Sequence, residues 1–321
     1  MINYKINQKI LHRFLLGNKF IKKNMFELDN LFNKKKVKDS RDGNHIFITG
    51  LARAGSTIML NNIFETKKLS SLTYQNMPFV MSPTISNMFL NNKESKYKER
   101  AHGDGIFINY SSPEALDEIF LKTYSDTELQ EFYPDYISLL LYIQSKKRYL
   151  SKNNYNYRRL SQLIDIFPNS NFLLLARSPI HHASSLHKQH QNFIKLQKKD
   201  KFVLRYMNYL GHYEFGLNHK PWFTPQSYSD PKELNYWLEQ WYLFYSNLTK
   251  KKLNNNMRYV VYEKLVDQSY IKNLFDFLKL NTDLVDFKNF NNANLKNKDF
   301  DNNLLKKSLE IYSEIKSVDN F

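Results

Sequence analysis

A short hydrophobic run that breaks into a glycine-containing turn constrains the fold more than any other feature of this sequence. Residues His45 to Thr49 are mostly apolar or β-branched, and the turn Gly50-Leu-Ala-Arg-Ala-Gly55 follows at once. Apolar residues at helical spacing come next, at Ile58, Met59, Leu60 and Ile63. The segment therefore predicts a strand, a tight turn and a helix whose N-terminus faces that turn.

Two further segments have the composition of buried strands. Asn171–Ala176 precedes Pro179 and a long polar helix to about residue 197, and Arg258–Tyr262 precedes helical spacing from 265 to 280. Other helical patterns cover about 112–122, 126–150, 158–167 and 231–250. Strands that alternate with helices predict an α/β fold, with a central parallel sheet flanked by helices.

The first 43 residues differ in pattern from the rest. Apolar and basic residues alternate, and the apolar ones fit loosely along a helical face: Ile6, Ile10, Phe14, Phe20, Ile21, Met25, Leu28, Leu31 and Phe32. We interpret residues 1–43 as an amphipathic helical segment with a linker, and residues 44–321 as the main domain. We expect the apolar face to pack on that domain; contact with a membrane surface is the alternative.

Composition excludes several classes of site. The chain of 321 residues has no cysteine, which excludes disulfides, thiolate nucleophiles and cysteine-ligated metals. Its apolar runs are too short for a transmembrane helix, and its N-terminus lacks the unbroken apolar stretch of a signal peptide. The sequence therefore predicts a cytoplasmic protein.

The excess of basic over acidic residues favours an anionic ligand. Forty-seven Lys and Arg against 31 Asp and Glu give a formal net charge of +16. A basic nucleic-acid-binding protein would have this charge too, but we find no nucleic-acid-binding motif and expect no nucleic-acid partner.

The turn has the spacing of a phosphate-binding loop but lacks the chemistry of a nucleotide hydrolase. Ser56 stands where the lysine of a kinase or NTPase would reach a triphosphate, and no apolar strand ends in a convincing magnesium-binding Asp. The turn offers instead an arginine, two hydroxyls and backbone amides, which suit a short anionic group without a metal. The predicted binding residues are Arg53, Ala54, Gly55, Ser56 and Thr57. A P-loop kinase or NTPase remains the alternative.

A second anion site is predicted where another strand ends. Arg177 follows the strand candidate 171–176, and Ser185 lies about two helical turns after Pro179. Arg177 and Ser185 are therefore predicted to converge on one phosphate. The nearby His181, His182, His187 and His190 have no adjacent carboxylate to complete a metal site, so we expect none.

In four ordered segments the chain resembles the sulfotransferases that use 3′-phosphoadenosine 5′-phosphosulfate (PAPS), especially their bacterial branch. Phe47–Ile58 is similar to the family's 5′-phosphosulfate loop, and Phe167–Pro179 with Ser185 is similar to its 3′-phosphate motif. Tyr149–Asn153 and Arg258–Leu265 resemble two further elements, so the likeness spans about residues 45–280. It implies a three-layer α/β/α fold like that of P-loop NTPases, PAPS as co-substrate and no metal.

The resemblance also has departures. Ser178 stands where the family usually has Asp or Asn, and Ala54 where it often has Ser. The C-terminal Arg-Lys-Gly loop of the animal cytosolic enzymes is not found. Part of the 3′-phosphate site is therefore unidentified.

The resemblance implies transfer to an acceptor hydroxyl, which needs a general base. The segment from Glu99 to Gly105 groups titratable residues between glycines, and we predict His102, or alternatively Asp104, as the base. Lys152 is predicted to contact either the bridging oxygen or the transferred sulfate. Glu114 is interpreted as a helix-start residue. By the resemblance, the segment Tyr74–Phe79 is expected to line the acceptor pocket. A saccharide or a glycolipid is the expected acceptor.

Overall fold

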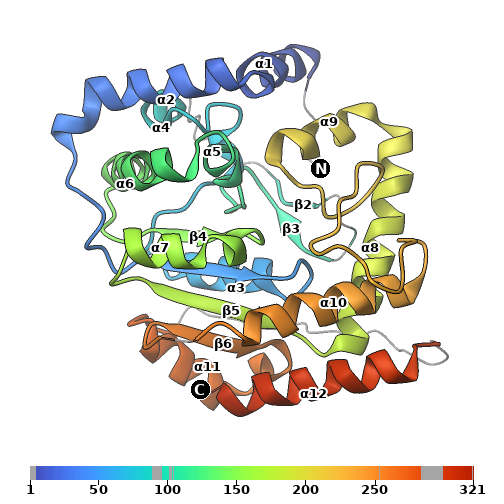
Figure 1. Cartoon of the computed structure of the whole chain (residues 1–321). Coiled ribbons are helices and arrows are strands. Elements are labelled where there is room, and N and C mark those ends of the chain that lie inside the picture. The colour runs from blue at the N-terminus through green and yellow to red at the C-terminus, as the bar shows by residue number, and fades with distance from the viewer. Residues whose placement is uncertain are drawn as a thin grey trace.

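The computed structural model describes residues 5–88, 96–100, 103, 105–252, 254–282, 299–319 and 321. A central sheet of four parallel strands has the order β4-β1-β5-β6 (Figure 1). Its strands are β1 (Ile46–Gly50), β4 (Leu150–Lys152), β5 (Asn171–Ala176) and β6 (Met257–Val261). The three strands predicted from apolar runs are confirmed, and β4 is an addition.

Side chains on the strands alternate between two hydrophobic cores. Ile46 and Ile48 enter one core with α3 (Ser56–Glu65) and α11 (Gln268–Phe277). Phe47 enters the other, larger core, which includes helices α6 (Asp126–Ile143) and α8 (Pro179–Lys199). Because both faces of the sheet are covered, the strands are apolar runs in sequence. The predicted three-layer α/β/α arrangement is confirmed.

The remaining elements complete the two covering layers. The larger core is built with α5 (Glu118–Leu121), α6 (Asp126–Ile143), α7 (Leu160–Ile166), α8 (Pro179–Lys199), α9 (Lys201–Leu210), α10 (Leu234–Thr249) and α12 (Asn302–Val318). Helix α4 (Pro83–Met88) packs outside this core, against α6. A two-stranded antiparallel ribbon joins β2 (Lys98–Glu99) to β3 (Phe107–Ile108). The helix predicted over about 112–122 is reduced to α5, and α12 has no counterpart in the prediction.

The parallel arrangement gathers three strand ends at one edge of the sheet. In the register of the ladder, Ile48 of β1 lies between Lys152 of β4 and Leu173 of β5. The loops that follow Gly50, Lys152 and Ala176 therefore start side by side. This is the edge at which open parallel sheets bind ligands.

Helices α1 (Ile6–Gly17) and α2 (Lys19–Asn33) lie along one outer edge of the molecule (Figure 1). The prediction that their apolar face packs on the domain is wrong for most of its residues. Ile6, Ile10, Phe14, Phe20, Leu28, Leu31 and Phe32 are all exposed. The inward side instead carries polar groups: Asp29 accepts hydrogen bonds from Ser82 and Thr84, and Asn30 donates to Asp135.

A buried histidine ties the start of β1 to the start of β4. His45 Nδ1 accepts from the amide of Tyr149 at 2.9 Å, so Nε2 carries the proton and donates to the carbonyl of Ser40 at 2.8 Å. Burial lowers the pKa of His45 to about 4, and the nearby Arg148 adds to the shift. The folded chain therefore needs this imidazole neutral.

Acid should weaken the fold through His45. Because its pKa is lowered in the folded state, its contribution is complete above about pH 6.5 and is lost as the pH falls toward about 4, with a limit of about 3 kcal/mol. His45→Gln keeps a donor and an acceptor but cannot titrate. Urea unfolding between pH 7 and 4 should show wild type losing stability faster than the variant. Parallel pH profiles would contradict this assignment.

Candidate active site

The loop after β1 is shaped by backbone conformations that favour glycine. Arg53 has φ +74° and Gly55 has φ +93°. A Cβ atom at Gly55 would lie 2.4 Å from the Tyr262 ring, so both the backbone and the neighbouring ring require glycine here. Helix α3 begins directly after Gly55, which puts Ser56 and Thr57 at a helix N-terminus. Backbone amides and the helix dipole at such a site favour an anion.

Arg177, at the end of β5, is held beside this loop. Its guanidinium lies over the Tyr262 ring, 4.4 Å from the centroid, and donates to the carbonyl of Arg53 at 3.3 Å. Its own carbonyl accepts from the indole of Trp241 at 3.0 Å. The buried Nε of Arg177 has no hydrogen-bond partner among the described residues. The arginine is therefore held in position while its buried Nε–H stays unpaired within the described part of the chain.

The start of α8 is bonded to the same loop. Arg53 Nε donates to Ser185 Oγ at 3.2 Å, and His182 Nε2 donates to the carbonyl of Ala52 at 2.7 Å. Burial lowers the pKa of His182 to about 3, partly opposed by the bond to Ala52, and both arginines lower it further. The structure thus brings Arg177 and Ser185 to Arg53.

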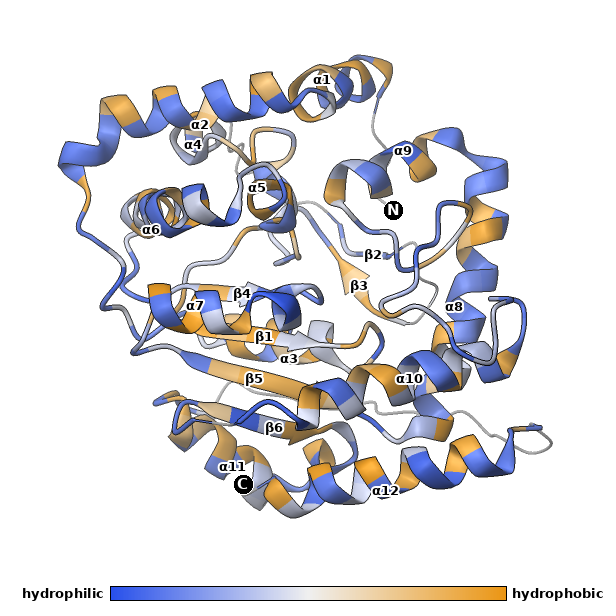
Figure 2. Ribbon diagram, in the orientation of Figure 1, coloured by the Kyte–Doolittle hydropathy of each residue, from blue (hydrophilic) through white to orange (hydrophobic). Residues whose placement is uncertain are grey.

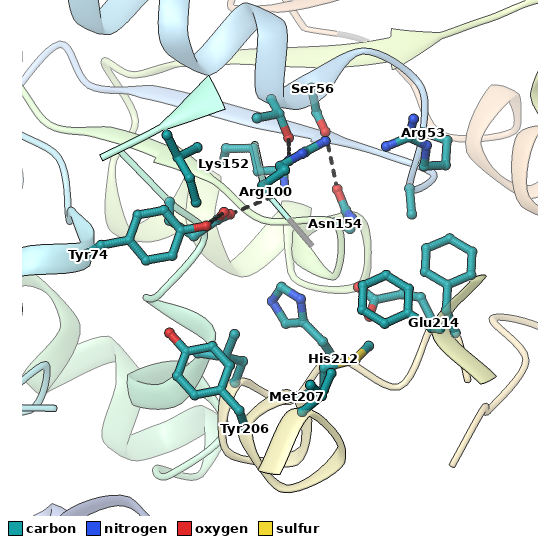
Figure 3. A pocket seen from close by; sticks show the side chains of 18 residues that line it. Arg53, Ser56, Tyr74, Arg100, Lys152, Asn154, Tyr206, Met207, His212 and Glu214 are labelled. Atoms are coloured by element: carbon teal, nitrogen blue, oxygen red, sulfur yellow. Dashed lines mark hydrogen bonds and ion pairs between the residues drawn. The ribbon is translucent and has the colours of Figure 1, made fainter. Parts of the chain in front are cut away.

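A cavity opens beside this cluster at the edge of the sheet where the strands end. One side is polar and is formed by Arg53, Ser56, Thr57, Tyr74, Arg100, Glu114, Lys152 and Asn154. The opposite side comes from α8, α9 and the chain after α9, and its apolar members include Phe193, Val203, Met207, Leu210 and Phe215. Figure 3 shows the His212 ring pointing into the cavity, toward its polar side. Such a cavity accommodates a ligand with an apolar body and a polar end.

A buried ion pair lies in the polar side. Lys152 Nζ is 4.0 Å from Glu114 Oε1, and the Tyr74 hydroxyl donates to Glu114 Oε2 at 2.5 Å. Burial alone would raise the pKa of Glu114, but Lys152, Arg100 and the hydroxyl together hold it below its usual value. Burial lowers the pKa of Lys152, an effect that Glu114 opposes. Glu114 is thus an ionised group that holds the lysine in the cavity.

Arg100 brings another segment to the site. It lines the cavity and donates to the Thr57 hydroxyl at 3.2 Å. The predicted bases His102 and Asp104 lie outside the described residues. Their assignment stays a prediction.

A model of the sulfotransferase family matches residues 45–283, well over half of the chain. The chain belongs to the sulfotransferase family. No curated protein matches the sequence.

Solved sulfotransferases have a similar fold. Sulfotransferase STF1 from Mycobacterium tuberculosis shares 12% identity and a TM-score of 0.52, over 97% of this chain and 87% of that chain. Sulfotransferase STF9 from Mycobacterium avium shares 7% identity and a TM-score of 0.45, over 98% and 79%. At these identities, the likeness to STF1 shows the fold alone.

Several polar groups of this sulfotransferase's cavity were not predicted from sequence. Glu114 was interpreted as a helix-start residue, which is wrong: α5 begins only at Glu118, and Glu114 faces Lys152 and Tyr74. Arg100 and His212 were not singled out. Arg100 lies within the segment from Glu99 to Gly105 that is predicted to hold the base, and that position is the only local signal.

Gly55→Ala should destabilise the sulfotransferase. The positive φ alone costs about 1–2 kcal/mol for a residue with a Cβ, and the contact with Tyr262 adds to that cost. Urea unfolding measures the loss. Gly17→Ala is the matched control, since its Cβ would lie 4.0 Å from the nearest atom, in Tyr209. Equal stability of the two variants would refute the account of the loop.

Proposed function

We propose that this sulfotransferase takes the sulfuryl group of PAPS and transfers it to an acceptor hydroxyl. The observation that carries the proposal is the convergence of Arg177 and Ser185 on Arg53, beside a helix N-terminus. The loop residues Arg53 to Thr57 would bind the 5′-phosphosulfate through amides and hydroxyls. Arg177 and Ser185 would bind the 3′-phosphate.

The proposed reaction exchanges one sulfur–oxygen bond for another. The acceptor oxygen bonds to sulfur while the bond from sulfur to the bridging phosphate oxygen breaks, which releases adenosine 3′,5′-bisphosphate. The acceptor proton passes to the base. Lys152, at the end of β4 in the polar side of the cavity, would stabilise the charge that develops on the departing oxygen. These steps use cationic side chains of the chain itself and require no metal.

The cavity favours an acceptor that is partly apolar. Aliphatic and aromatic side chains of α8 and α9 face the polar side where transfer would occur, among them Phe193, Val203 and Met207. A free saccharide would leave this wall without an apolar partner. Between the two predicted acceptors, we therefore propose the hydroxyl of a glycolipid or a similarly amphiphilic molecule.

We propose that the base lies in the segment after Arg100. Arg100 contacts Thr57 and lines the cavity, which supports a functional role for the chain that bears His102 and Asp104. Among the residues that the structure describes, His212 is the alternative base because its ring points into the same cavity (Figure 3). Glu114 is a poorer candidate because its carboxylate already accepts from Tyr74 and faces Lys152.

Loss of either arginine should weaken binding of adenosine 3′,5′-bisphosphate. Arg53→Ala and Arg177→Ala should each cost about 1.5–3 kcal/mol, the range of a charge-assisted hydrogen bond, measured by calorimetric titration. Arg205→Ala on the exposed side of α9 removes the same charge and should leave affinity unchanged. Wild-type affinity in both site variants would reject the proposed cofactor site.

Removal of the base should affect turnover and spare the cofactor. His102→Ala should lower kcat by about 10²–10⁴ while bisphosphate affinity stays near that of wild type, since a base acts in the transition state. Asp104→Ala should lower kcat less than His102→Ala does if Asp104 only orients the histidine. It should lower kcat more than His102→Ala does if Asp104 is the base.

His212→Ala provides the comparison. The proposal for the segment after Arg100 fails if His212→Ala abolishes turnover while the variants at His102 and Asp104 remain active. Sulfate transfer from labelled PAPS, with saturating acceptor, distinguishes these results.

A further inference from the structure

Helices α1 and α2 each expose large apolar side chains at helical spacing. Ile6, Ile10 and Phe14 recur every fourth residue on α1 and are 79%, 64% and 61% exposed. On α2, Phe20, Leu28, Leu31 and Phe32 are between 54% and 74% exposed. We call these seven residues the α1–α2 face. Residues at these spacings share one side of a helix, so the exposure is organised and not scattered.

The α1–α2 face is directed away from the rest of the molecule. Contacts tie α1 to α9, and α2 to α4 and α6, along the inward sides of the two helices. Leu15, Leu16 and Phe26 make the apolar part of that inner contact and are buried. Figure 2 shows hydrophobic positions between hydrophilic ones along both helices, at the outer edge of the fold. The described part of the chain leaves this face uncovered.

The same helices carry a strong positive charge. Residues 5–36 include nine Lys and Arg against two acidic residues, and one of those acids, Asp29, is buried in hydrogen bonds to Ser82 and Thr84. Exposed cations stand beside the apolar residues in sequence, or directly after α2: Lys5, Arg13, Lys19, Lys35 and Lys36. Lys34 forms an ion pair with Asp135. The α1–α2 face therefore combines apolar anchors with cations at its borders.

We propose that the α1–α2 face binds the surface of an anionic lipid bilayer. Phe, Leu and Ile side chains between Lys and Arg are the composition of helices that lie in the bilayer interface, where anionic headgroups attract the cations. Helices of 12 and 15 residues are too short to span a bilayer. No helix in the described residues is long and apolar enough to cross a membrane. The two helices lie on the surface.

Charge favours a bilayer over a second copy of the chain. A twofold contact through this face would bring the same cationic borders together, and like charges repel in an apolar contact. Anionic headgroups neutralise those charges while the apolar residues enter the interface. The inference holds for either acceptor class, because it concerns the outer side of α1 and α2 and none of the proposed cofactor residues.

The face is linked to the wall of the cavity. His12 on the inward side of α1 lies against Phe202 and Tyr206 of α9, with ring centroids 6.2 and 5.9 Å apart. Tyr206 also lines the cavity. A bilayer against α1 would therefore be separated from the proposed acceptor site by α1 and α9.

Vesicle flotation tests the proposal with the full chain. Wild type should float with vesicles of phosphatidylglycerol and phosphatidylcholine, much less with phosphatidylcholine alone, and less at high salt. The triple variant Phe14→Ser, Phe20→Ser, Phe32→Ser should partition onto the anionic vesicles at least about tenfold less than wild type does. Changing Arg13, Lys19 and Lys35 to Gln should also weaken binding to anionic vesicles.

A matched variant separates this effect from general surface changes. Tyr142, Val266 and Leu309 are exposed apolar residues elsewhere, and their change to Ser should leave flotation unchanged. Circular dichroism and bisphosphate binding verify that each variant is folded. Undiminished flotation of the apolar triple variant, or no flotation of folded wild type, overturns the proposal. A dimer in sedimentation velocity that is lost in the triple variant also overturns it, because the face would then bind a second copy.

Discussion

The site depends on one constraint, the way the loop after β1 is held between α8 and the end of β6. His182 binds the carbonyl of Ala52, Arg177 binds that of Arg53, and the Tyr262 ring closes against Gly55. Two carbonyls of the loop thus accept hydrogen bonds, one from α8 and one from the residue that follows β5. The same loop leads into the N-terminus of α3, where backbone amides and the helix dipole favour an anion, so the position of the binding site follows from how the loop is fastened.

Local patterns were sufficient to predict the sheet and the loop. β1, β5 and β6 are apolar runs because both faces of the sheet are covered, and the glycine turn and Arg177 each follow directly from a strand. β4 was harder to predict because it is short and contains a serine and a lysine. Its strand character comes from pairing with β1, a contact distant in sequence.

Two other features depended on contacts that no local pattern reveals. Glu114 belongs to the site because the chain brings it to Lys152 and Tyr74, which are distant in sequence. The N-terminal helices are predicted to bury most of their apolar residues, but only Leu15, Leu16 and Phe26 are fully buried. Hydrogen bonds of Asp29 and Asn30 help to fix the inward side of α2. Periodicity identified both helices and could not specify their orientation. The domain boundary at residue 43 stays a prediction.

Helix α9 serves two surfaces at once. Phe202 and Tyr206 contact His12 of α1, while Val203, Tyr206 and Met207 form a wall of the cavity. Tyr206 belongs to both sets, so the width of the cavity and the seating of α1 are mechanically coupled. A load that presses α1 toward the core reaches the cavity wall through contacts that include the Tyr206 ring, and a bulky molecule in the cavity pushes back on α1 through the same contacts.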